Sequence, residues 1–155
     1  MKYFMILVVF LTTALISEEL QVKANSFSAD ENAGISIFIG NVNVIKANDE
    51  LNASKVTVYT DKKRQPTKFV AIGDVCVHVQ TIDGAIYNGK AQKVVYFPDK
   101  KEYYFYKDVY LEQVDEKKEI TGDEVVLKTI EGKAYAKGDK SEPVMMIFKL
   151  KEKEK

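Results

Sequence analysis

The sequence has only one cysteine, Cys76, and only one histidine, His78, among its 155 residues. A lone cysteine excludes an internal disulfide bond. The two residues are also too few to build a zinc or other transition-metal site, which needs three or four such ligands. They are two positions apart in one strand-like segment, with no oxyanion loop and no third member, so they do not predict a catalytic dyad. We expect no metal and no cofactor.

The chain also lacks an excess of either charge and lacks the common catalytic motifs. Lys and Arg number 23 together, and so do Asp and Glu. This balance disfavours a nucleic-acid-binding protein, which usually carries a basic excess. There is no glycine-rich phosphate loop and no nucleophile elbow. Asp74, Asp123 and Glu124 fall in repeated turn-like segments, so we interpret them as structural and predict that the protein is not an enzyme.

Long hydrophobic runs are absent except at the N-terminus, where residues 3–16 carry no charge and follow Lys2. This run is shorter than the roughly 18–20 residues that span a bilayer and is typical of a secretory signal peptide. We predict a signal peptide over residues 1–17, with cleavage between 14 and 24. A single domain over 18–150 and a charged, disordered tail over 151–155 would follow. Export without a disulfide framework favours a bacterial periplasmic protein.

Helical periodicity is missing from the rest of the chain. Apolar residues instead alternate with a period of two, as at Val75, Val77 and Val79. Short clusters of turn-forming residues separate the alternating segments. Many short strands joined by turns predict an all-β fold: a sandwich, a barrel or a jelly roll.

A short pattern recurs along the chain: glycine or lysine, then asparagine or aspartate, then valine. Its copies are residues 40–42, 73–75 and 107–109, at spacings of 33 and 34 residues. Each copy is followed by a strand-like segment that starts with a small residue and has a valine three positions later. Such a two-strand unit cannot bury its apolar face alone, so the units must stack on one another. Because Lys107 replaces glycine in the third copy, we expect a gentler bend there.

Stacked units of this kind predict antiparallel strands in two facing sheets, with one face of every strand turned into the space between them. Alternation assigns the bulky apolar side chains to that interior. The candidate interior residues are Phe38, Val42, Val44, Val56, Val58, Val75, Val77, Val94, Tyr96, Phe105, Val109, Leu111, Val125, Leu127 and Phe148.

The order of the segments resembles a known family. The patterns F-x-G-N-V-x-V, L-x-A-x-K-V-x-V-Y, A-x-G-x-V, Y-x-G-K-A-x-x-V-x-Y and L-x-Q-V-D…I-x-G-D follow one another between about Val22 and Leu150. This order is similar to that of the LptA, or OstA-like, family of lipopolysaccharide-transport bridge proteins.

The resemblance implies an open, V-shaped β-jelly roll that acts as a periplasmic carrier. Such a protein shields the lipid A acyl chains of lipopolysaccharide in an apolar groove and passes them from the inner to the outer membrane. The implied partners are lipopolysaccharide, an inner-membrane-anchored transport partner, the outer-membrane lipopolysaccharide translocon and further copies joined head to tail. The interior residues would then be lipid-binding.

An open jelly roll also leaves unpaired strand edges, which invite strand addition from a neighbour. The candidate assembly edges contain Val22, Ala24, Val144, Met146 and Phe148.

Three other interpretations stay open. The first is a carrier of the same fold that remains anchored in the membrane. The second is a periplasmic carbohydrate-binding or hydrolytic β-sandwich, which would need paired carboxylates in a cleft beside aromatic platforms. The third is a purely structural β-protein, whose interior would hold no space beyond its own packed side chains.

Overall fold

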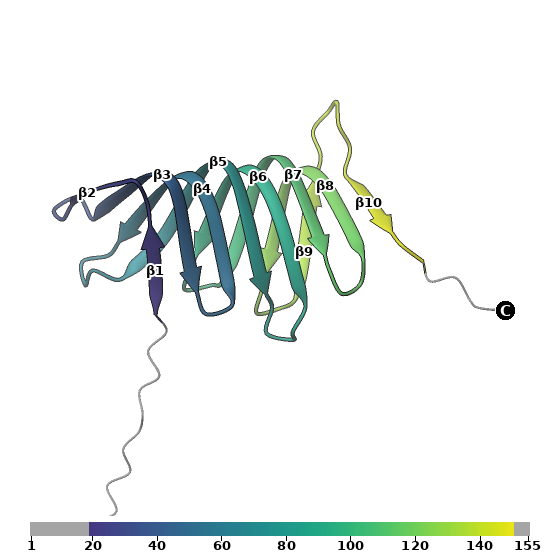
Figure 1. The fold of residues 1–155 in the computed structure, drawn as a ribbon. Coiled ribbons are helices and arrows are strands. Elements are labelled where there is room, and N and C mark those ends of the chain that lie inside the picture. Colours follow the sequence, from purple (N-terminus) through teal and green to yellow (C-terminus); the bar gives the residue numbers. More distant parts are fainter. Residues whose placement is uncertain (1–18, 151–155) are drawn as a thin grey trace, which may run out of the picture.

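The computed structural model describes residues 19–150 and confirms the all-β prediction (Figure 1). The strands are β1 (Leu20–Lys23), β2 (Ser26–Asp30), β3 (Ile35–Lys46), β4 (Asp49–Thr60), β5 (Pro66–Gln80), β6 (Ile86–Phe97), β7 (Glu102–Gln113), β8 (Lys118–Lys128), β9 (Lys133–Lys137) and β10 (Met145–Phe148). Within these residues no helix is long and apolar enough to cross a membrane. The predicted signal peptide, 1–17, and the predicted tail, 151–155, lie outside the described residues.

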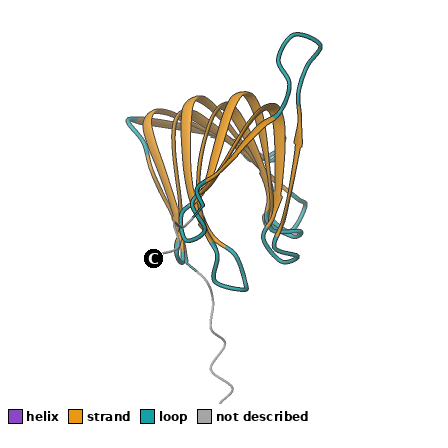
Figure 2. Cartoon of the chain, turned by 90° about the vertical axis from the view of Figure 1, so that its right-hand side faces the viewer, coloured by secondary structure: helices purple, strands orange, loops and turns teal. Residues whose placement is uncertain are grey.

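All strands belong to one antiparallel sheet, which is folded along its middle into a V (Figure 2). The long strands β3 to β8 each run through both legs of the V. The short strands lie in one leg only, because β1 pairs with the second half of β3 and β2 with its first half. At the other end β10 and β9 pair with the two halves of β8 in the same way. We name the legs after their first strands, the β1 leg and the β2 leg. The expected pair of facing sheets is thus one continuous sheet.

The fold line, or ridge, lies at the repeated sequence pattern. The pairing register shifts there in β3, β5 and β7, between Ile39 and Val42, between Ile72 and Val75, and between Tyr106 and Val109. Two residues in each strand have positive φ, beginning with Gly40 at 85°, Gly73 at 89° and Lys107 at 66°. Lys107 therefore adopts the same left-handed backbone as the glycines, and the expectation of a different bend in the third copy is wrong.

The two strands of each repeat unit pair with each other at the ridge. The valine of the first strand stands opposite the small residue of the second: Val42 opposite Ala53, Val75 opposite Ala91 and Val109 opposite Gly122. A valine and a small side chain fit together where the sheet folds on itself and the inner faces of the legs converge. The repeat of about 33 residues is thus one hairpin of two bent strands.

The space just below the ridge is filled with apolar side chains from both legs. Val56, Val94 and Phe105 have no exposed surface. Burial of such side chains supplies most of the stability of a fold of this kind, at roughly 1.5–3 kcal/mol for each Val, Leu or Phe removed from water.

Within residues 19–150, the two ends of the folded sheet have no further strand paired to them. One end is formed by β1 and β2, and the other by β9 and β10. Between β9 and β10 the loop of residues 138–144 projects from the ridge (Figure 1). Asp139 stabilises this loop by accepting backbone hydrogen bonds from Ser141 and Glu142 at 2.7 and 2.6 Å.

Candidate functional site

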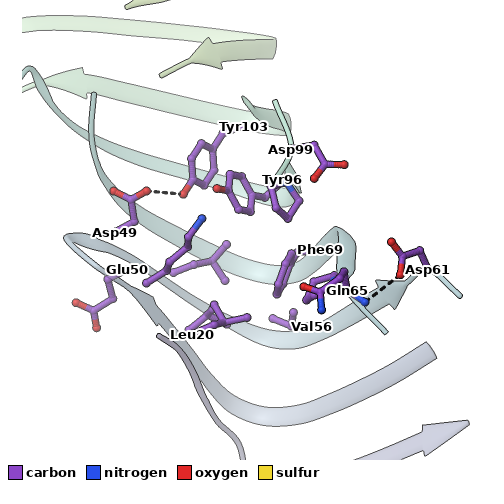
Figure 3. A pocket seen from close by; sticks show the side chains of 15 residues that line it. Leu20, Asp49, Glu50, Val56, Asp61, Gln65, Phe69, Tyr96, Asp99 and Tyr103 are labelled. Carbon is purple, nitrogen blue, oxygen red and sulfur yellow. Dashed lines mark hydrogen bonds between the residues drawn. The ribbon is translucent and has the colours of Figure 1, made fainter. Parts of the chain in front are cut away.

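A cavity of about 490 Å³ opens between the two legs, on the side away from the ridge (Figure 3). Its size lies within the range of ~300–1,000 Å³ that is usual for small-molecule sites. Apolar and aromatic side chains form its inner part, and charged or polar ones form its rim. The lining residues are Leu20, Val44, Lys46, Asp49, Glu50, Leu51, Val56, Asp61, Gln65, Pro66, Phe69, Tyr96, Pro98, Asp99 and Tyr103.

A row of aromatic rings forms the wall of the cavity on the β2 leg. Phe69, Tyr96 and Tyr103 occupy paired positions on β5, β6 and β7. The ring centroids of Phe69 and Tyr96 are 6.0 Å apart, and Tyr96 stacks on Tyr103 at 4.4 Å. Aromatic pairs at these separations pack favourably and are stiff. The wall is therefore a preformed apolar surface.

Tyr103 also connects the two legs. Its hydroxyl donates a hydrogen bond to Asp49 Oδ2 at 3.1 Å, across the cavity, while Asp49 Oδ1 accepts the backbone N–H of Gln80 at 3.1 Å (Figure 3). Burial, and then the charge of Asp49, raise the pKa of Tyr103 above its ordinary value. The phenol is thus neutral at physiological pH and acts as a donor that holds the legs at a fixed distance.

Two carboxylates at the rim of the cavity, Asp61 and Asp49, accept hydrogen bonds from backbone N–H groups. Asp61 accepts the backbone N–H groups of Lys63 and Gln65 at 2.8 and 3.0 Å, which closes the turn between β4 and β5. Asp49 is engaged as described above. Asp61 thus stabilises its own turn, whereas Asp49 connects the start of β4 to β5 and β7. Carboxylates engaged in this way are poorly suited to acid/base work in a hydrolase. The inner part of the cavity presents mainly apolar and aromatic surface.

The cavity does not extend through the whole molecule. Towards the β9–β10 end, the turn between β5 and β6 on the β1 leg contacts the turn after β8 on the β2 leg: Ile82 N–H donates a hydrogen bond to Thr129 O at 3.2 Å. Higher up, the side chain of Phe105 reaches from the β2 leg to Gly89 of the β1 leg. The apolar cavity therefore belongs to the half of the trough nearest the β1–β2 end.

The structure places nearly all candidate interior residues between the legs. All of them are buried except Phe38, which is partly buried and packs on the core, and Phe148. Phe148 lies on the same inner face as Ile120, because Met146, two positions before it, pairs with Ile120, but Phe148 is 55% exposed. The reason is that β10 is a short outer strand that pairs with β8 alone and is exposed along its whole length.

Only Val44, Val56 and Tyr96 of the candidate interior residues line the cavity itself. The sequence-based set missed Leu51, Phe69 and Tyr103. Phe69 and Tyr103 are each two positions before a residue on the interior face, Ala71 and Phe105, so the period of two could have identified them. Nothing in the sequence marks Asp49 as the partner of Tyr103.

The candidate assembly residues lie at the two ends of the sheet. Val22 is in β1, and Ala24 follows that strand. Val144 directly precedes β10, which contains Met146 and Phe148. Their placement at free strand edges leaves backbone groups available for pairing.

Cys76 and His78 lie on the outer face of the β1 leg. Cys76 is exposed, and His78 Nδ1 is 2.7 Å from Asn88 Oδ1 on the neighbouring strand. Between residues 19 and 150 no group of three or more His, Cys, Asp or Glu side chains could hold a metal ion.

Comparisons with known proteins agree with this architecture. A family model described as "LptA/(LptD N-terminal domain) LPS transport protein" matches residues 21–133. Among solved structures, the chain is similar to LptH of Pseudomonas aeruginosa, described as the LptA-homologous periplasmic component of the lipopolysaccharide transport device. The TM-score is 0.76 at 17% identity, covering 86% of this chain and 96% of that one, so the likeness shows a shared fold. A search of curated protein sequences gives no match.

Proposed function

Because the chain belongs to the LptA/LptD N-terminal-domain family of lipopolysaccharide transport proteins, we propose that it is a periplasmic carrier that holds lipid A acyl chains between its legs. The observation that supports this most is the apolar cavity between the legs, with its aromatic wall of Phe69, Tyr96 and Tyr103. An acyl chain needs a dry surface and no catalytic group.

The energetics suit a carrier. Each buried methylene contributes ~0.8 kcal/mol, so one chain of roughly 12 carbons brings on the order of 10 kcal/mol. A site that bound the cargo in a fully closed cavity would not release it again. The open side of the V supplies an exit.

Site-specific photo-crosslinking tests this proposal. A benzophenone side chain at Tyr96, which lines the cavity, should capture purified lipopolysaccharide. The same side chain at Asn52, on the outer face of the β1 leg, should not. Equal capture at both positions, or none at Tyr96 in a folded protein, would show that the cavity is not the lipid site.

Assembly head to tail is the second part of the proposal. Chain direction alternates along the sheet: β8 runs from the β1 leg to the β2 leg, and β9 and β10 return. A β1–β2 pair from a second copy runs in the direction that would continue this antiparallel order beyond β9 and β10. The exposed apolar side chains of Met145, Met146 and Ile147 would be covered in such a contact.

Disulfide trapping tests this arrangement. In a Cys76→Ser background, cysteines at Val22 and Met146 should give a ladder of covalent multimers under oxidation. A control pair at Val22 and Asn88, which lies in the middle of the sheet, should stay monomeric. The absence of multimers from the first pair at concentrations where the protein self-associates would contradict head-to-tail stacking.

We also propose that the protein is exported by its N-terminal segment and works in the periplasm, with an inner-membrane-anchored partner at one end and the outer-membrane translocon at the other. Mass spectrometry of the protein recovered from the cell envelope should find an N-terminus produced by cleavage between residues 14 and 24. An intact N-terminal run would favour the membrane-anchored carrier of the same fold.

A further inference from the structure

The outer face of the β2 leg carries an apolar stripe that the carrier function does not use. Strand pairing aligns one outward-facing residue from each of seven neighbouring strands into a single row. The row is Ile37, Thr57, Val70, Val95, Tyr104, Val126 and Tyr135. These side chains alternate with the buried interior residues, so they lie on the outside of the V. Ile39 and Ile72, in the next row towards the ridge, are 50% and 46% exposed.

Lysines flank this stripe on both sides. One row lies towards the ridge. The other lies towards the rim of the leg, that is, the edge where its strands end in turns. Together the two rows contain six lysines and two glutamates. They are Lys55, Lys93, Glu124 and Lys137 near the ridge, and Lys68, Glu102, Lys128 and Lys133 near the rim. The turn that follows β4 adds Lys62 and Lys63 below the second row.

Three of the six lysine side chains lie against aromatic rings of the same face. The Nζ of Lys68 is 4.4 Å from the ring centroid of Tyr59, and the Nζ of Lys93 is 5.6 Å from that of Tyr106. Lys128 stands over Tyr135 at 5.7 Å. Aliphatic stems resting on rings, with the ammonium groups at the margin, make a surface that is apolar in its middle and cationic around it.

The outer face of the β1 leg is different. Its side chains are mainly polar and bond to one another: Asn43 Nδ2 donates to Asn52 Oδ1 at 2.9 Å and to Glu50 Oε1 at 2.7 Å. The pair of His78 and Asn88 continues this pattern. Although the net charge of the sequence is zero, the outer face of the β2 leg is apolar and bordered by lysines, whereas that of the β1 leg is polar.

We propose that the outer face of the β2 leg docks on the surface of a bilayer rich in anionic phospholipid. Tyrosine and isoleucine side chains suit the boundary between headgroups and acyl chains, and flanking lysines attract anionic headgroups. Seven strands at a spacing of about 4.8 Å make a patch about 30 Å wide, which many headgroups contact at once. The charge complementarity favours a lipid surface over a protein partner, since lysines border the apolar stripe along both of its long sides, as anionic headgroups border the acyl region of a bilayer. The inference goes beyond the proposed carrier function and does not depend on the cavity.

Vesicle binding tests the proposal with the protein recovered from the cell envelope. Vesicles of phosphatidylcholine with phosphatidylglycerol should bind it, and pure phosphatidylcholine vesicles should bind it much less. The variant Lys55→Gln/Lys68→Gln/Lys93→Gln should bind anionic vesicles more weakly by on the order of a hundredfold, roughly fivefold per lysine. The control Lys23→Gln/Lys90→Gln/Lys117→Gln, which makes the same charge change on the β1 leg, should bind like the unmodified protein. All variants share one N-terminus, so its contribution cancels.

The absence of tryptophan provides a second measurement. The single reporter Tyr104→Trp, in the apolar stripe, should shift its emission to the blue on anionic vesicles. Tyr110→Trp, on the outer face of the β1 leg, should not. Equal loss of binding in both lysine variants would overturn the proposal, as would a shift at Tyr110→Trp only. Crosslinking of this face to an envelope protein, with no vesicle binding, would assign it to a protein partner and also overturn the proposal.

Discussion

The Phe105 ring of the β2 leg packs directly on the backbone of Gly89 in the β1 leg. A Cβ atom built on Gly89 would lie 2.6 Å from Phe105 Cε1 and 2.9 Å from Cζ. No real side chain tolerates such a contact, so glycine at this position is what lets the two legs approach and lets Phe105 fill the trough.

We therefore expect Gly89→Ala to destabilise the fold by roughly 1–3 kcal/mol, the usual cost of overpacking a core. Urea unfolding followed by circular dichroism measures the loss. The cost should shrink in a Phe105→Leu background, because leucine lacks the ring atoms that clash. If Gly89→Ala cost the same in both backgrounds, the ring contact would not be its cause.

The ridge should respond in opposite ways to two substitutions. Gly73 has a φ of 89°, and a Cβ there would lie 2.7 Å from Ser54 Cβ, so Gly73→Ala should cost roughly 1–3 kcal/mol. Lys107 holds the same left-handed conformation without being glycine, at a strain of ~1–2 kcal/mol. Lys107→Gly should thus leave stability unchanged or raise it by up to about 1 kcal/mol, after the entropy of glycine is subtracted.

Thermal melts of the two variants at one pH would check this prediction. A lower melting temperature for Lys107→Gly would mean that the lysine side chain stabilises the ridge by more than its backbone costs.

These ridge residues also show how far the sequence leads. The period of two and the recurring Gly-Asn-Val pattern were enough to predict bent, stacked antiparallel strands, because both are local consequences of alternation and backbone sterics. The continuity of the sheet through the ridge was not predicted, since a bend and a strand end look alike in sequence. Phe148 has the alternation of an interior residue and lies on the inner face, but nothing in the local sequence reveals that β10 is the end strand of the described sheet and leaves Phe148 exposed.

The contact between Tyr103 and Asp49 was invisible in the sequence, because it joins residues 54 positions apart across a cavity. It predicts a specific pH dependence. The raised pKa of Tyr103 means that the folded protein keeps the phenol proton more tightly than the unfolded chain does. Its contribution to stability is fully present below pH ~10, the pKa of a tyrosine in an unfolded chain, and is lost as the pH rises above that value.

Tyr103→Phe should accordingly lower stability at neutral pH by ~1–3 kcal/mol, since Asp49 loses a donor. Above pH ~10 its stability should fall less steeply than that of the unmodified protein. Melting temperatures between pH 8 and pH 11 measure both effects. Parallel alkaline slopes for the two proteins would show that Tyr103 does not carry the dependence.

Filling the cavity should separate lipid uptake from folding. Val44 is 9% exposed and lines the cavity, so a larger side chain there has room to enter the space of about 490 Å³. We expect Val44→Phe to change stability by less than about 1 kcal/mol, because the new ring occupies a preformed void and displaces no core atom. It should nevertheless reduce capture of lipopolysaccharide by the photo-crosslinker at Tyr96, since the ring and the acyl chain compete for the same volume.

Asn43→Phe, one position away on the outer face, adds the same side chain outside the cavity and should leave capture unchanged. Undiminished capture in Val44→Phe would place the bound chains elsewhere along the trough.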